Sequence, residues 1–212
     1  MNTLPISREQ LIAGLTQTRQ VAASAGGNLP FLKLARSGHW AYGQDETPVS
    51  PDDVWAVNVH SIQRGYISWG DGEVLDERMV GLLDQPIDRS DLPETGAGWD
   101  PQIGMDLVCV DGEAKGQGVL YRTTSHGGRR ACDNLISLII SQVQAGSEEY
   151  VPAIYLRVDS YQHKKYGKTF VPNFEIQNWY GPDATNVVHD EDEAEEEPPP
   201  PRTARSRLLR RS

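Results

Sequence analysis

Glycine and proline interrupt this chain at short intervals. Its 212 residues include 20 glycines and 14 prolines, which are scattered rather than confined to one segment. Both residue types end helices and strands, so their spacing favours short elements joined by turns. The segments between them are rich in β-branched and aromatic residues, which favour strands. We predict strands over residues 31–35, 39–43, 53–69, 105–110, 118–124, 151–158 and 169–179.

One segment has the period of a helix instead. Residues 129–144 place Cys132, Leu135, Ile136, Ile139 and Val143 at helical spacing on one face. Residues 7–24 predict a second, shorter helix, for which Ser7 is a plausible N-cap. The chain therefore combines many short strands with one strongly amphipathic helix.

The order of these elements indicates a fold. Three or four strand units, one helix and then two strands is the layout of the OB-fold, a Greek-key barrel with its helix between the third and fourth strands. A β-sandwich is the competing architecture, since it also suits many short strands. The single helix favours the first. We expect a mainly β, OB-fold-like β-barrel with one central helix over residues 29–182, after a helical extension at 1–28.

Residues 183–212 form a tail of different composition, which we expect to be disordered. The acidic block at 190–197, DEDEAEEE, repels itself and stays solvated. Four prolines at 198–201 favour polyproline II. Residues 202–211 then hold five arginines and no acid. None of this sequence can bury enough apolar area to offset the entropy of ordering.

Charge is unevenly distributed along the chain. The formal net charge is −10, yet residues 45–113 alone carry 16 acids and 3 bases, a charge of −13. Residues 1–44 and 114–182 each carry a charge of +3. An acidic protein with this distribution can still present a basic face. That face would come from the two ends of the body.

The location and redox state follow from what the sequence lacks. Cys109 and Cys132 are the two cysteines, and no apolar signal segment begins the chain. We expect reduced, buried thiols in a cytoplasmic protein. No apolar run approaches the roughly 20 residues that span a bilayer, so no membrane association is expected. The oligomeric state is not indicated.

A basic and aromatic segment links the last two predicted strands. Period-2 alternation places Ile154, Leu156 and Val158 on one face of a strand, which is expected to be core, and Tyr155 and Arg157 on the other. Single-stranded nucleic acid is bound by aromatic faces beside cations, and this segment interleaves both. The alternative is a solvated turn. The predicted binding residues here are Tyr155, Arg157, Tyr161, Lys164, Lys165, Tyr166 and Lys168.

Two further clusters are candidates for the same interface. Arg64 and Tyr66 share one face of their strand, and Trp40 and Tyr42 lie in neighbouring strands, where most aromatic residues of a small barrel are core. The segment SHGGRR at 125–130 precedes the helix. Its glycines and the helix N-terminus expose N–H groups suited to phosphate, and the nearby candidates are Tyr121, Arg122, Arg129 and Arg130. A glycine turn with solvated arginines is the alternative.

Enzyme motifs are weak. Asp100, Asp106, Glu113 and Lys115 loosely imitate a magnesium-dependent nuclease, in which two acids hold the metal. Asp111-Gly112, however, is typical of a hairpin turn, so these side chains are expected to face solvent. The histidines have no metal-ligand spacing, and no nucleophile elbow or dinucleotide motif is present. We therefore expect a protein that is not an enzyme and needs no cofactor or metal.

Three segments carry a resemblance. Residues 31–49, 62–77 and 160–179 (SYQHKKYGKTFVPNFEIQNW) look like a family of uncharacterised tailed-bacteriophage proteins encoded among replication and recombination genes. The body with its acidic tail also resembles OB-fold single-stranded-DNA-binding proteins, whose acidic terminus recruits replication enzymes and competes with DNA. Here Pro and Arg follow the acidic block instead of a terminal hydrophobic residue, which departs from that pattern.

Two functions follow as hypotheses. The first is non-sequence-specific binding of single-stranded DNA in phage replication or recombination, in the host cytoplasm, with replication proteins as partners of the tail. The second is a non-enzymatic phage structural or protein-interaction module, whose acidic segment 45–113 engages a basic partner.

Overall fold

The computed structural model describes residues 29–165 and 167–185. The helix predicted over 7–24 and nearly all of the charged tail lie outside these residues. The described chain is mainly β, with ten strands, one α-helix and three short 3₁₀ helices, η1 to η3. The strands are β1 Phe31–Leu34, β2 Trp40–Tyr42, β3 Thr47–Pro48, β4 Val54–Val57, β5 Gln63–Gly70, β6 Glu73–Gly81, β7 Asp100–Asp111, β8 Gly118–Thr123, β9 Val151–His163 and β10 Gly167–Tyr180.

The predicted amphipathic helix is confirmed as α2, which spans His126–Gln144. It begins three residues before the predicted start because Ser125 is its N-cap, and the Ser125 hydroxyl accepts from the Gly128 N–H at 3.0 Å. Cys132, Leu135 and Ile139 are buried, as the period predicted. Val143 is half exposed, because the buried face of the helix ends one turn earlier.

The strand predicted over 53–69 is two strands. Both β4 and β5 pair with the same edge of β7, β4 along its second half and β5 along its first. The 3₁₀ helix η1 (Val59–Ser61) separates them, and the Asn58 side chain caps it by accepting from the His60 N–H. The sheet therefore forks at β7. One branch continues through β4 to β9 and β10, and the other is the β5–β6 hairpin.

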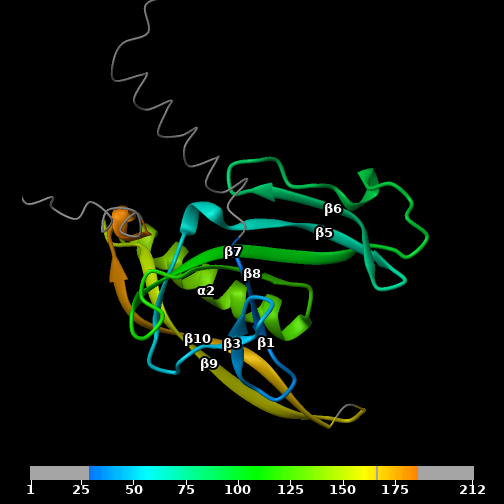
Figure 1. Ribbon diagram of the computed structural model, residues 1–212. Helices are drawn as coiled ribbons and strands as arrows, with labels where there is room; N and C mark the ends of the chain where they lie inside the picture. The colour runs from blue at the N-terminus through cyan, green and yellow to red at the C-terminus, as the bar shows by residue number, and fades with distance from the viewer. Residues whose placement is uncertain (1–28, 166, 186–212) are drawn as a thin grey trace, which may run out of the picture.

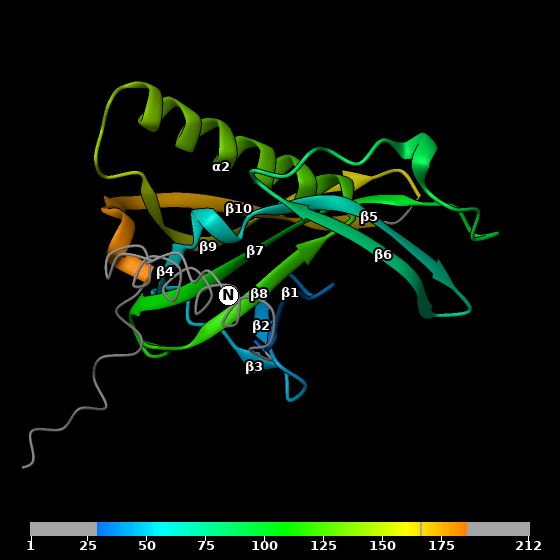
Figure 2. The same cartoon turned by 90° about the horizontal axis from the view of Figure 1, so that it is seen from above.

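The sheet curls around α2 as a half-barrel (Figures 1 and 2). On the other edge of β7 the order continues through β8, β1, β2 and β3. The segment that contains β1 and β2, near one end of this path, contacts β9 and β10 at the other end. The Trp40 indole donates to the Arg157 carbonyl at 3.1 Å, and a Cβ on Gly38 would lie 2.6 Å from the Phe170 ring. A curled sheet with one helix is the fold that positions the site.

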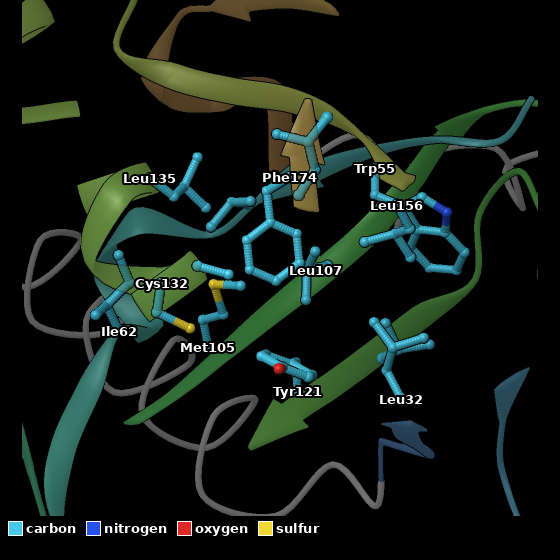
Figure 3. Packing of buried hydrophobic residues seen from close by; sticks show 14 of the residues in the cluster. Leu32, Trp55, Ile62, Met105, Leu107, Tyr121, Cys132, Leu135, Leu156 and Phe174 are labelled. Carbon is cyan, nitrogen blue, oxygen red and sulfur yellow. The ribbon is translucent and has the colours of Figure 1, made fainter. Parts of the chain in front are cut away.

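The core lies between α2 and the concave side of the sheet (Figure 3). Trp55, Leu107 and Ile154 are fully buried at its centre. Cys109 and Cys132 are free and buried, as predicted. Burial raises the pKa of the Cys109 thiol to about 11 and that of Cys132 to about 12, so both stay protonated at neutral pH.

The sequence missed two strand features. Strand β6, EVLDERMVG, is charged and has no buried residue, so it lacks the apolar face that marks a strand. Strand β9 continues to His163, five residues past its predicted end, whereas β10 begins at Gly167, two residues before its predicted start, and the two strands pair along their whole length. The basic segment is therefore the tip of a long hairpin rather than a long loop.

Candidate nucleic-acid interface

A groove opens where the sheet forks. It has a volume of about 510 Å³ and lies between the first turns of α2, the paired starts of β5 and β7, and the loop at residues 86–87. Four of the residues predicted from sequence line it, although they come from segments more than 60 residues apart. The side chains that give the groove its character are Arg64, Tyr66, His126, Arg129, Arg130 and Asp133.

Two of the three arginines are held by backbone acceptors. Arg64 Nη2 donates to the Asp84 carbonyl at 2.9 Å, and Arg129 Nε donates to the Thr124 carbonyl at 3.1 Å. Neutral acceptors fix a guanidinium without cancelling its charge. Three ion pairs occur in the described ranges, and none of them includes Arg64, Arg129 or Arg130. The groove therefore keeps three positive charges against the single carboxylate of Asp133.

Tyr66 adds an aromatic face to this charge. It lies two residues after Arg64 on the same side of β5, as predicted, and both residues are partly exposed in the groove. Guanidinium groups bind phosphate oxygens through paired N–H donors. A neighbouring aromatic ring offers a stacking surface for a base. The groove thus has the chemistry for one or two nucleotides of a single strand.

The glycines before α2 have a packing role that the sequence did not indicate. A Cβ on Gly128 would lie 2.2 Å from the Thr123 hydroxyl oxygen, and one on Gly127 would lie 2.5 Å from a methyl of Val171. These glycines let the first turn of the helix approach β8 and β10. The Gly128 N–H is bonded to Ser125. This N–H group, one of those predicted to bind phosphate, is therefore already satisfied.

The β9–β10 hairpin reaches past the end of α2 at which the helix begins (Figures 1 and 2). Near its tip Tyr161 is half exposed, and Lys164 and Lys165 are exposed in the turn. The Lys168 ammonium lies 4.8 Å from the centre of the Phe170 ring. The side chain of Tyr166 lies outside the described residues. The tip is therefore a second cationic and aromatic surface at the groove's end of the molecule.

Nearer the start of β9 the predicted alternation of buried and exposed residues is confirmed, but Arg157 is already paired with an acid. Ile154 and Leu156 are buried, whereas Tyr155 and Arg157 are partly exposed on the other face. Arg157 pairs with Glu175 at 2.8 Å and lies 4.4 Å from the centre of the Tyr155 ring. This pair stiffens the hairpin and leaves less charge for a ligand than the sequence suggested.

Four predicted residues lie elsewhere. Trp40 and Tyr121 are 4% exposed and pack together in the core with ring centres 5.7 Å apart (Tyr121 in Figure 3), so neither can stack on a base. Tyr42 packs on the buried Trp55. Arg122 donates to both carboxylate oxygens of Glu77, at 2.7 and 2.8 Å. We leave all four out of the interface, because burial or pairing occupies them.

The acids of the suggested nuclease cluster are separated. Asp100 and Asp106 lie six positions apart on β7, which is roughly 20 Å along a strand. Within residues 29–165 and 167–185, no three His, Cys, Asp or Glu side chains are placed to hold a metal ion. His126, by contrast, lines the groove, and it lies in the candidate segment 125–130 but was not among the predicted binding residues. Its position just before the predicted start of the helix, next to Gly127, could have indicated that it lies at the site.

Comparison of the chain with protein-family models, with curated proteins and with solved structures finds no match. No α-helix in the described part of the chain has the length and apolar character needed to cross a bilayer. The site must therefore be interpreted from its own geometry and charge.

Proposed function

We propose that this protein binds single-stranded DNA without sequence preference. The DNA backbone would contact Arg64, Arg129 and Arg130 in the groove, and Tyr66 would stack on a base. The strand would continue over the hairpin tip at Lys164 and Lys165. The observation that supports this proposal most strongly is the convergence of three arginines and one tyrosine, from separate segments, on one open groove.

The arrangement also suits the proposed fold family. In an OB-fold, strands and the loops between them bind oligonucleotides along one face of the barrel. The curled sheet with one helix before the last two strands is compatible with that fold. The resemblance to tailed-phage proteins would place the activity in phage replication or recombination, with replication proteins as further partners.

The test is a fluorescence-anisotropy titration of the full chain with labelled oligo-dT at low salt. Binding should weaken as salt rises, because counterions are released from the DNA. Lys164→Ala with Lys165→Ala should weaken binding several-fold. Lys33→Ala with Lys115→Ala removes the same charge from β1 and the β7–β8 turn, and should leave the affinity within about twofold of wild type. Absence of binding at tens of micromolar would overturn the proposal.

A second function, a protein-interaction module, is favoured by a different region. Residues 69–94, from the tip of β5 through β6 and the loop after it, carry eight acids and two bases. We call this region the acidic wing. Such a surface repels DNA and suits a basic partner. A protein that binds a basic partner but no oligonucleotide would fit this function and contradict the first.

A further inference from the structure

The acidic wing has an unusual surface. Trp69, Val74 and Leu75 are about half exposed near the hairpin tip, Leu82 is 41% exposed, and Leu83 is completely exposed. Two of its acids are neutralised by nearby arginines, Asp76 by Arg78 and Glu77 by Arg122. The remaining acids, at both ends of β6 and in the loop after it, keep the wing negative. Apolar side chains among unpaired acids are typical of a docking surface.

The wing also has a free edge. Strand β6 pairs only with β5 in the described part of the chain, and the hairpin extends away from the body (Figure 2). In an antiparallel pair, every second residue directs its N–H and C=O groups away from the partner strand. Along β6 such groups are available to another extended segment, except for the Glu77 and Gly81 N–H groups, which donate to the carboxylates of Asp76 and Asp84 at 2.8 Å. Its nine residues span about 30 Å.

One segment of this chain matches the wing in charge, length and apolar content. Residues 202–211 carry five arginines around Leu208 and Leu209. Ten extended residues span about 33 Å, close to the length of β6. The 16 residues after Thr185 reach about 50 Å when extended, whereas a body of this size is roughly 40 Å across. The acidic block at 190–197, by contrast, is repelled by the wing.

We propose that residues 202–211 bind the acidic wing along the free edge of β6. The arginines contact the unpaired acids, including Glu73, and the two leucines cover the exposed Leu82 and Leu83. This contact uses the free edge of β6 with Leu82 and Leu83, and it does not use the cationic side chains of the groove or of the hairpin tip. The two charged blocks of the tail therefore behave differently, since the arginine block is attracted to the wing and the acidic block at 190–197 is not.

The test is hydrogen exchange, measured by mass spectrometry on the full chain over residues 73–83. The variant has all five arginines replaced: Arg202→Ser, Arg205→Ser, Arg207→Ser, Arg210→Ser and Arg211→Ser. At low salt, the outward-facing amides of β6 should exchange about tenfold faster in the variant than in wild type, as expected when several exposed ion pairs act together. The difference should disappear at high salt.

Two additions make the test specific. A synthetic peptide of residues 198–212 should restore slow exchange in the five-serine variant, and the same peptide with its arginines replaced by serine should not. Glu73→Gln with Leu83→Ser should weaken the effect in the full chain. The matched control, Leu138→Ser with Glu148→Gln, alters one exposed leucine and one exposed acid outside the wing and should have no effect. Equal exchange of residues 73–83 in wild type and the five-serine variant would overturn the proposal.

Discussion

The groove and the acidic wing are built from the same strand but have opposite character. Strand β5, eight residues long, carries Arg64 and Tyr66 in the groove near its start and ends at Trp69 and Gly70, on the wing. The groove is backed by the core and by backbone acceptors that hold two of its arginines. The wing has exposed apolar side chains and an unpaired strand edge. A net charge of −10 therefore describes neither region, and placement of charge in the fold decides which partner each can bind.

A substitution at Gly65, which lies between the groove and the wing, has the largest expected effect on stability. A Cβ on Gly65 would lie 1.8 Å from the Arg78 carbonyl oxygen, which is a backbone atom that cannot turn aside. Gly65→Ala should therefore force β6 away from β5 and lower the free energy of unfolding by about 3 kcal/mol or more. Chemical denaturation measures this change. Gly181→Ala, where a Cβ meets nothing within 4 Å and the backbone is not left-handed, is a control for loss of a glycine, and a cost equal to that of Gly65→Ala would contradict the account.

Asp106 on β7, the strand at which the sheet forks, gives a smaller, pH-dependent effect. Burial raises the pKa of its carboxyl to about 6, which the nearby Arg122 charge only partly offsets. The folded state therefore holds this proton more tightly than the unfolded state, and stability should fall as pH rises from about 4 to 6. Because the group is partly exposed, Asp106→Asn should stabilise the protein by roughly 1–2 kcal/mol at pH 7.5.

Thermal unfolding at two pH values checks this prediction. At pH 3.5 the carboxyl of Asp106 is protonated in the folded state, so Asp106→Asn should give little or no gain there. Asp45→Asn removes one negative charge from an exposed turn and controls for net charge. A gain of the same size at both pH values would show that ionisation of Asp106 is not the cause.

Tyr66 separates stacking from charge within the groove. Tyr66→Ala should weaken oligo-dT binding about tenfold, since a stacked base contributes roughly 1–3 kcal/mol. Tyr66→Phe keeps the aromatic face and should bind nearly as wild type does. Anisotropy titration measures both variants. Equal weakening by the two substitutions would assign the role to the hydroxyl, and no weakening by either would remove Tyr66 from the interface.

Particular residues show what the sequence could predict. The helical period of Cys132, Leu135 and Ile139 located α2, because a buried helix face repeats strongly in sequence. The alternation of Ile154 and Leu156 with Tyr155 located the inner face of β9 for the same reason. Strand β6 was missed because neither of its faces is buried, so its residues follow no apolar pattern.

The candidate site was only partly predictable, since a residue type does not reveal its contacts. Arg64 and Arg130 are chemically like Arg122 in the sequence, yet Arg122 is paired with Glu77 on a strand that was not predicted. Trp40 and Tyr121 carry rings suited to stacking, but the curl of the sheet buries them against each other. Pairing and burial of this kind depend on contacts between distant segments, which local patterns do not encode.

The central claim is that the groove binds DNA and the wing does not. The most direct measurement compares the salt dependence of oligo-dT affinity for wild type, Arg130→Gln in the groove and Arg78→Gln in the wing, which remove equal charge. For a single strand, each phosphate neutralised contributes about 0.7 to the slope of log K against log salt. Our account predicts that Arg130→Gln weakens binding and lowers the slope by about 0.7, whereas Arg78→Gln changes neither. Equal changes for the two variants, or a larger change for Arg78→Gln, would contradict it.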